Sequence, residues 1–195
     1  MVMSDYLILN ALSFPILSTT IFVPLVGALL LLILKNDTLI KATAFTAGIV
    51  NFLISLLLYF RFDPTTHLFQ FGEFARWIPS YNINYILGID GITIFLILLT
   101  TMLAPTCVLC SWTAIEHRVK EFMFCILIME SAMVGVFCAL DFILFYIFWE
   151  AMLIPMYLLI AIWGGPNKDY ASIKFFIYTL FGSVFLLVAI IALYL

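Results

Sequence analysis

Long apolar runs alternate with short polar linkers along this chain of 195 residues. A helix needs about 20 mainly apolar residues to span a bilayer, because each residue adds about 1.5 Å to its length. The pattern therefore predicts an all-α integral membrane protein with six transmembrane helices. The runs with few or no charges cover residues 14–34, 42–60, 91–115, 122–140, 142–162 and 175–195.

A longer polar stretch, residues 61–90, separates the second run from the third. Aromatic and aliphatic residues alternate with smaller or polar ones in segments 69–71 and 81–85, and Pro79 lies between them. This alternation favours a short β-hairpin outside the membrane. An irregular amphipathic loop, with Trp77 and the tyrosines at the membrane interface, is the alternative.

The composition agrees with lipid as the solvent for most of the chain. Hydrophobic residues make up 66% and charged residues only 10% of the sequence, whereas a soluble domain has about 25% charged residues. The net charge of −3 is spread thinly. No basic patch is present that would suggest a nucleic-acid partner.

The basic residues predict how the helices cross the bilayer. Six of the eight Lys and Arg residues lie in linkers 35–41, 116–121 and 163–174, and the other two lie in the 61–90 stretch. The positive-inside rule places the three basic linkers on the cytoplasmic or matrix side. Residues 61–90 and both chain ends then face the outer side.

Four cysteines, Cys107, Cys110, Cys125 and Cys138, lie in or beside apolar runs. No electropositive neighbour is present that would make Cys107 or Cys110 a reactive thiolate. We therefore expect all four to be small buried hydrophobic residues. Their spacing predicts neither a disulfide framework nor a metal site.

Two acidic residues, Glu130 and Glu150, lie deep inside apolar runs. Glu130 follows Lys120 by ten residues, which is about 15 Å into the bilayer from the inner side. Glu150 follows Phe142 by eight residues, about 12 Å from the outer side. A tight turn near Asp141 would bring both carboxyls close to the middle of a hydrocarbon layer about 30 Å thick.

A lone charge at this depth costs at least about 2.5–3.5 kcal/mol. A carboxyl avoids the cost by binding a proton or by meeting a cation or water, so such a group is a candidate switchable proton site. The alternative is structural: a protonated Glu can hydrogen-bond to another helix and contribute about 1 kcal/mol. Pro155 removes the helical bond to the Ala151 carbonyl and predicts a kink near Glu150. That kink either serves packing or lines a wet cavity.

Other polar residues have simpler interpretations. Lys174, about one turn into the last helix, can extend its amine back to the inner surface, and a role in a buried relay is the alternative. Asp90 and Asp141 precede helices and are expected to be N-caps. His67 and His117 lie in loops, and neither belongs to a group of residues with metal-ligand spacing.

Four blocks of sequence carry a resemblance to a known family. The blocks are ILGIDGITIFLILLTTMLAP (86–105), KEFMFCILIMESAM (120–133), LDFILFYIFWEAMLIPMYLLIAIWGG (140–165) and KFFIYTLFGSVF (174–185). They resemble the antiporter-like membrane subunits of respiratory complex I. Within that family, FWEAMLIPM, with LGIDGI and KFFIYT in order, is similar to the branch called subunit M in bacteria and subunit 4 in mitochondria.

The resemblance implies a fold of about fourteen helices with two inverted repeats, each resembling a half-channel with a broken helix. This chain would be its N-terminal portion. Residues 1–90 would form a helix pair with the outer-face hairpin or loop. Residues 91–195 would form the third to sixth helices, including the start of the first half-channel. The location implied is an energy-transducing membrane, either the mitochondrial inner membrane or a bacterial plasma membrane.

The resemblance also implies a function, which is proton translocation coupled to NADH oxidation by quinone. Glu150 in the FWE motif would pair with a lysine on a seventh helix and gate proton movement, and Glu130 would belong to the same charged axis. No redox chemistry is expected in this chain, because flavin, iron–sulfur clusters and quinone would belong to other subunits. Expected partners are lipid and the other membrane-arm subunits, including adjacent antiporter-like chains.

The sequence ends at Leu195, before the lysine-bearing helix. We expect either a fragment or a split gene whose second chain supplies the missing helices. Two other functions stay open: a subunit of a multi-subunit cation/proton antiporter or membrane hydrogenase, and a structural fragment that moves no protons. Co-purified flavin and iron–sulfur absorbance would separate complex I from the antiporter. A dry helix contact at Glu150 would favour the structural fragment.

Overall fold

The computed structural model describes residues 7–9, 14–81 and 83–194. Six helices in these ranges are long and apolar enough to cross a membrane, which confirms the predicted number of spans, although several ends differ by a few residues. They are α1 (Ile16–Ile33), α2 (Asp37–Arg61), α3 (Thr93–Cys110), α4 (Val119–Cys138), α5 (Phe142–Trp163) and α6 (Lys168–Tyr194).

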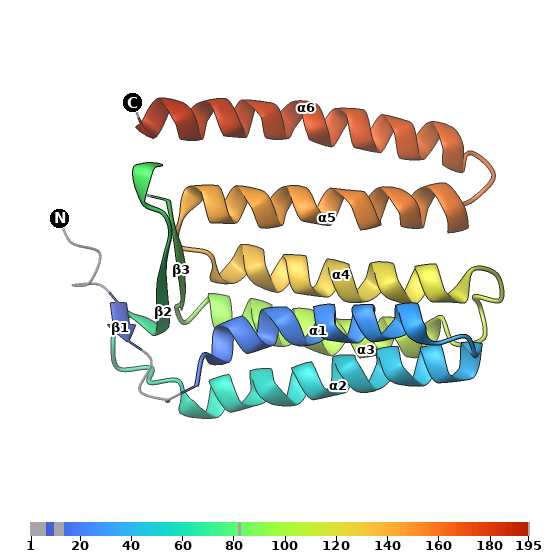
Figure 1. Ribbon diagram of the computed structural model, residues 1–195, viewed down its shortest axis with the longest axis horizontal. Coiled ribbons are helices and arrows are strands. Elements are labelled where there is room, and N and C mark those ends of the chain that lie inside the picture. The colour runs from blue at the N-terminus through green and yellow to red at the C-terminus, as the bar shows by residue number, and fades with distance from the viewer. Residues whose placement is uncertain (1–6, 10–13, 82, 195) are drawn as a thin grey trace.

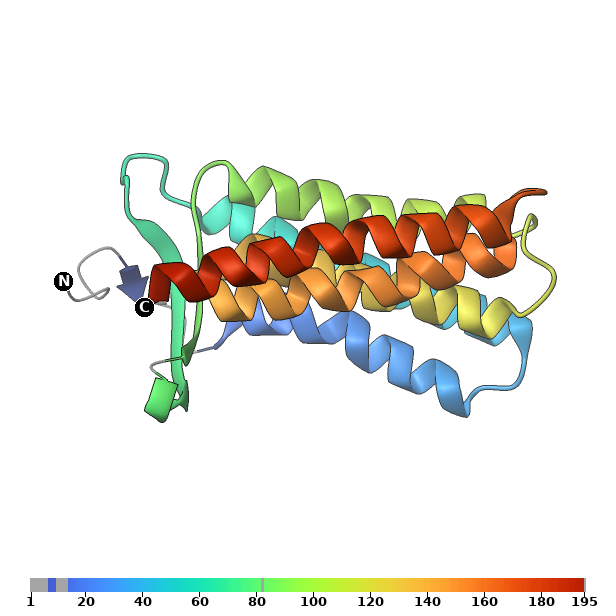
Figure 2. The same ribbon diagram turned by 90° about the horizontal axis from the view of Figure 1, so that it is seen from above.

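The helices run side by side, and their connections gather at two ends (Figures 1 and 2). Helices α1 to α4 pack against one another, α5 packs on α4, and α6 packs on α5. The α1–α2, α3–α4 and α5–α6 linkers lie at one end, opposite the strands (Figure 1). The three basic linkers therefore share one end of the bundle, as expected. Which side of the membrane that end faces stays a prediction.

A small sheet crosses the other end of the bundle. Strands β2 (Phe69–Ile78) and β3 (Ile83–Ile89) are antiparallel, and a 3₁₀ turn at Pro79–Tyr81 lies between them. The hairpin, rather than an irregular loop, is therefore confirmed. Strand β1 (Leu7–Leu9) adds a parallel partner to β2, and no feature of the sequence predicted it.

The hairpin supplies the cap of α1. Pro15, at the N-cap position, has no side-chain oxygen to accept a bond. Glu73 of β2 accepts instead from the Leu17 N–H at 2.8 Å, from the Ser18 N–H at 3.1 Å and from the Ser18 hydroxyl. The Tyr85 hydroxyl lies 2.9 Å from the Ser18 hydroxyl, and burial raises the pKa of Tyr85. A carboxylate thus meets the electropositive end of a helix from another element.

Two aspartates accept from amides at helix starts; Asp141 is the N-cap of α5, as expected, whereas Asp90 precedes Ile92, the N-cap residue of α3, by two positions. Asp141 accepts from the Ile143 N–H at 2.9 Å and the Leu144 N–H at 3.2 Å at the start of α5. Asp90 accepts from the Thr93 N–H at 2.7 Å. This bond to Thr93 is the main cause that lowers the pKa of Asp90. Asp141 also accepts from the Asn84 N–H at 3.2 Å and so joins the hairpin to α5.

Lysines at the opposite end fasten neighbouring segments. Cations near helix C-termini are favourable, because the last carbonyl groups carry partial negative charge. Three lysines donate from Nζ to backbone carbonyls there: Lys41 to Trp112 at 2.6 Å and Ile115 at 3.3 Å, Lys120 to Leu32 at 3.2 Å, and Lys168 to Ile162 at 2.8 Å.

The contact between α4 and α5 is close. A Cβ added at Gly135 would lie 2.4–2.6 Å from the ring of Phe148, so α5 approaches α4 as near as it does because position 135 is glycine. The expectation for the cysteines was half right. Cys125 and Cys138 are buried, but Cys107 and Cys110 are exposed on α3, where lipid can cover them as well as protein can.

Candidate functional site

The two membrane carboxyls lie at the same depth. Glu130 precedes Cys138, the last residue of α4, by eight residues, and Glu150 follows Phe142, the first residue of α5, by eight. Each is therefore about 12 Å from the end of the bundle that bears the sheet. The expectation of matched depth agrees with these helix ends.

Glu130 faces the interior of the bundle that helices α1 to α4 form. Its side chain is fully buried, at 0% exposure, and so is that of Asn51 on α2. The Asn51 Nδ2 group donates to Glu130 Oε1 at 2.8 Å. Glu130 Oε2 and Asn51 Oδ1 have no hydrogen-bond partner among the described residues. An unpaired buried acceptor is costly, at about 1–3 kcal/mol each.

Buried hydroxyl groups occur close to this pair along α2 and α4. Ser55, one turn after Asn51 on α2, lies 2.7 Å from the hydroxyl of Thr101 on α3. Ser131, beside Glu130, donates to the Ile21 carbonyl of α1 at 2.6 Å. Polar groups from all four helices therefore meet in the otherwise apolar interior.

Glu150 lies in different surroundings. It is partly buried on α5, and its Oε1 atom is buried without a hydrogen-bond partner among the described residues. Tyr146, one turn earlier on α5, interacts with both the Glu150 carboxyl and Ser183 of α6. The two carboxyls therefore have different neighbours: Glu130 is bonded to Asn51 of α2, whereas Glu150 lies on α5, the helix on which α6 packs.

Pro155 lies inside α5, between the carboxyl and the basic end of the bundle. The helix continues from Phe142 to Trp163 without interruption, and the Pro155 side chain is buried. Proline has no N–H to donate to the carbonyl of Ala151. A free backbone acceptor thus follows Glu150 by one residue, on the side away from the sheet.

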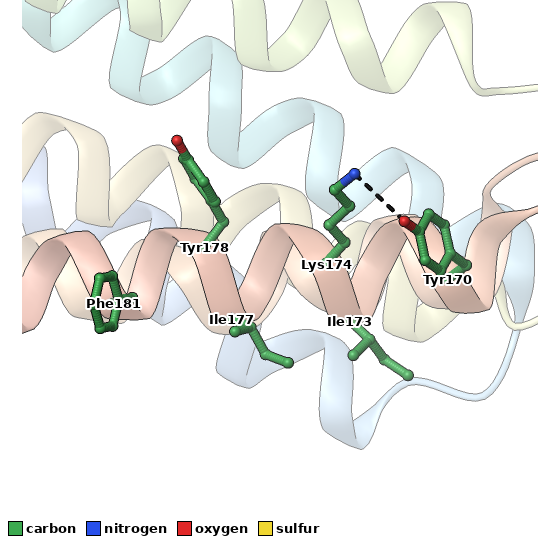
Figure 3. A pocket seen from close by; sticks show the side chains of 6 residues that line it. All are labelled: Tyr170, Ile173, Lys174, Ile177, Tyr178 and Phe181. Atoms are coloured by element: carbon green, nitrogen blue, oxygen red, sulfur yellow. Dashed lines mark hydrogen bonds between the residues drawn. The ribbon is translucent and has the colours of Figure 1, made fainter.

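Lys174 is on the exposed surface of α6. Its Nζ atom donates to the Tyr170 hydroxyl at 3.4 Å and lies 5.4 Å from the centre of that ring. No ion pair within 4 Å joins Lys174 to an acid in the described part of the chain. A shallow groove of about 370 Å³ runs along α6 at this lysine, and Figure 3 shows Lys174 among the side chains that line it. The groove is lined by Tyr170, Ile173, Lys174, Ile177, Tyr178 and Phe181.

The geometry thus gives the three predicted site residues, Glu130, Glu150 and Lys174, different neighbours. It adds Asn51 beside Glu130, and Tyr146 beside Glu150, which our sequence reasoning missed. An asparagine in the middle of an apolar run was a usable signal, because a buried amide needs partners. No group of three His, Cys, Asp or Glu that could hold a metal occurs in the ranges that the structure describes.

Comparisons with known proteins agree with this architecture. Residues 139–195 match the family model described as NADH:quinone oxidoreductase/Mrp antiporter, TM. NADH-ubiquinone oxidoreductase chain 4 of Arabidopsis thaliana is 45% identical over 178 residues, covering 90% of this chain and 36% of that protein. NADH-quinone oxidoreductase subunit M of Rhodobacter capsulatus is 46% identical over 185 residues, covering 92% and 36%.

Solved structures give the same result. Respiratory complex I from Thermus thermophilus with bound NADH contains a chain that superposes with a TM-score of 0.72 at 29% identity, covering 86% of this chain and 33% of that one. The Mrp complex from a Dietzia species has a chain with the same TM-score at 15% identity, which shows a shared fold alone.

The chain spans about a third of the length of the curated relatives that it matches. Relatives that are membrane subunits of respiratory complex I also confirm the expected location in a mitochondrial or bacterial membrane. The sequence blocks, the six membrane helices with their hairpin and the comparisons all agree. The chain belongs to the family of antiporter-like membrane subunits that includes NADH-quinone oxidoreductase subunit M and NADH-ubiquinone oxidoreductase chain 4.

Proposed function

We propose that this chain is a membrane-arm subunit of NADH:quinone oxidoreductase and takes part in proton translocation through Glu150. The observation that carries the proposal is the environment of Glu150: a carboxyl at mid-membrane depth with one oxygen buried and unpartnered. The relatives named above are subunits of NADH oxidoreductases. Electron transfer through flavin, iron–sulfur clusters and quinone is assigned to other subunits.

The chemistry follows from the cost of charge in lipid. An ionised carboxyl at this depth is unfavourable unless a cation or water stabilises it. When a cation approaches Glu150, the ionised form is favoured and the proton leaves; when the cation withdraws, a proton binds again. One pKa unit corresponds to about 1.36 kcal/mol, so modest movements of charge suffice to load and release a proton.

Neighbouring groups on α5 and α6 support this role for Glu150. The hydroxyl groups of Tyr146 on α5 and Ser183 on α6 are polar groups in the region of the Glu150 carboxyl. The unbonded Ala151 carbonyl beyond Glu150 offers a further acceptor for water. Neither feature adjoins Glu130, so Glu150 is the better candidate for the translocated proton.

Lys174 is proposed to have a supporting role rather than to pair with Glu150. It is exposed on α6, about six residues from the basic end of that helix. Its amine can extend to the membrane surface, or it can pass protons toward the basic end if a further helix covers the groove. The cation that pairs with Glu150 is proposed to come from elsewhere in the assembly, as the family resemblance implies.

Glu150→Gln tests the proposal in membrane vesicles that contain the complete enzyme. The variant should assemble and oxidise NADH, but coupled acidification should fall to the background level, because an amide cannot bind and release the proton. Glu150→Asp keeps the ionisable group on a shorter side chain and should retain part of the activity. A Glu150→Gln enzyme that moved the normal number of protons for each NADH would refute the proposal.

A further inference from the structure

With Glu130 ionised, the Asn51–Glu130 pair has one hydrogen-bond donor too few for its acceptors. Asn51 Nδ2 donates to one Glu130 oxygen at 2.8 Å, while the other Glu130 oxygen and Asn51 Oδ1 have no donor among the described residues. Both side chains are fully buried. Two acceptors on facing groups are thus left unpaired in a part of the protein where unpaired polar atoms are strongly unfavourable.

The neighbouring hydroxyl groups have no hydrogen to spare. A serine or threonine hydroxyl carries a single hydrogen. Ser131 gives its hydrogen to the Ile21 carbonyl. Ser55 and Thr101 lie 2.7 Å apart, and each also reaches a carbonyl of its own helix. The polar groups around the pair therefore satisfy themselves and leave both acceptors unpaired.

Among the described residues, no Lys or Arg on helices α1 to α5 is near enough to balance a charge on Glu130. Helices α1 and α3 contain no Asp, Glu, Lys or Arg, and Glu150 is the one such residue of α5. On α2, Lys41 and Arg61 each lie ten residues from Asn51, about 15 Å along the helix. On α4, Lys120 is at a similar distance from Glu130. An ionised Glu130 would therefore be a lone buried charge.

We infer that Glu130 holds a resident proton on Oε2 and donates it to Asn51 Oδ1, so that a neutral acid–amide pair joins α4 to α2. The carboxylate takes up one proton from water as the protein assembles, and no other bond forms or breaks. This single hydrogen turns Glu130 Oε2 into a donor and gives Asn51 Oδ1 the donor that it lacks, so neither atom is left unpaired. The site is separate from Glu150, and the inference does not rest on the proposed function.

A protonated Glu130 predicts that the substitution Glu130→Gln preserves the hydrogen bonds of the pair. A glutamine amide has the carbonyl that accepts from Asn51 Nδ2 and a permanent N–H for Asn51 Oδ1. The substitution therefore reproduces the hydrogen bonds of the protonated acid, and the midpoint of thermal unfolding should be unchanged. Asn51→Leu removes one bond and leaves the acid without its partner, so that midpoint should fall.

Infrared difference spectroscopy tests the proton directly. The full chain, with isotope-labelled glutamate, is reconstituted in lipid bilayers at neutral pH. The spectrum of the wild type minus that of Glu130→Gln should contain the carbonyl stretch of a protonated carboxyl, shifted in deuterium oxide. In Asn51→Leu the same stretch should move to higher frequency, because the acid has lost its acceptor.

Glu121→Gln is the matched control, because Glu121 lies on the same helix in an exposed ion pair with Arg118 at 3.3 Å. Its difference spectrum should contain the bands of an ionised carboxylate. The inference is overturned if the Glu130 difference spectrum also contains those bands, as it would with a water molecule bridging an ionised acid and Asn51. It is equally overturned if Glu130→Gln lowers the unfolding midpoint as much as Asn51→Leu does.

Discussion

Helices α1–α4 and helices α5–α6 are similarly apolar in sequence but differ in how much of their surface the chain itself covers. In the most apolar window of α4, 56% of the residues are buried, compared with 17% in α5 and 11% in α6. The first region contains a closed interior with the Asn51–Glu130 pair. The second is a layer with large exposed apolar surface, which requires lipid or protein to cover it.

Under the two proposals above, the same residue type serves two purposes at one depth. Glu130 lies where the polar groups nearest to it are already bonded and no Lys or Arg of the described helices α1 to α5 is within reach, so a fixed proton stabilises it. Glu150 lies beside α6, at the edge of the region that the chain covers less. A carboxyl that must exchange its proton needs access to water and to movable charge, and the second region is the one where these can reach it.

Replacing Gly135 by alanine should have the largest effect on stability, because it acts where the two regions meet. The new methyl group would lie 2.4–2.6 Å from the Phe148 ring, so α5 must move away from α4. Overpacking of this kind costs about 1–3 kcal/mol. Unfolding titrations in detergent, followed by circular dichroism, measure the loss.

Gly182→Ala is the matched control in the second region. Nothing lies within 4 Å of a Cβ at Gly182 on α6. The free energy of unfolding should stay the same or rise by about 0.5–1 kcal/mol, the usual gain for alanine over glycine in a helix. Equal losses at the two positions would contradict the close contact between α4 and α5.

Glu73→Ala should have the next largest effect, and it acts on the first region alone. It leaves the amides of Leu17 and Ser18 without an acceptor at the start of α1. Loss of a helix cap costs about 0.5–2 kcal/mol. Hydrogen exchange at the first turn of α1 should accelerate, while exchange in α6 should not. Glu73→Gln, which keeps one accepting oxygen, should lose less, and accelerated exchange in α6 would argue against a local cap.

Replacing Asp90 by asparagine should have the smallest effect on the free energy of unfolding, and the size of that effect should depend on pH. Hydrogen bonds from Thr93 hold the pKa of Asp90 below its ordinary value of 3.8. The ionised group therefore stabilises the start of α3 at pH values above 3.8, and this contribution is lost as the pH falls through the lowered pKa.

The carboxylate at a helix start contributes about 0.3–1 kcal/mol. The difference in unfolding free energy between the wild type and Asp90→Asn should stay constant from neutral to mildly acidic pH and then shrink. A difference that grew on acidification would have the wrong sign.

The spans, the hairpin and the Asp141 cap could be predicted from the sequence, because each is a local pattern. The depth of Glu130 and Glu150 followed from counting residues along helices. The exposure of Cys107 and Cys110 could not be predicted, since lipid and a protein interior are equally apolar. Composition alone does not distinguish the two environments.

Contacts between distant segments were also beyond the sequence. Asn51 and Glu130 are separated by 79 positions, and Glu73 is 56 positions from the amide of Leu17 that it caps. Strand β1 has three residues, too few for an alternating pattern. These features depend on how the elements pack. Packing determines that Glu130, and not Glu150, accepts a hydrogen bond from Asn51.

We propose that Glu150 exchanges its proton during turnover while Glu130 keeps its own. Proton translocation per NADH, measured in parallel for Glu150→Gln and Glu130→Gln in vesicles with the complete enzyme, tests it most directly. Translocation should be lost in the first variant and retained in the second. Retention in Glu150→Gln, or equal loss in both variants, would contradict it.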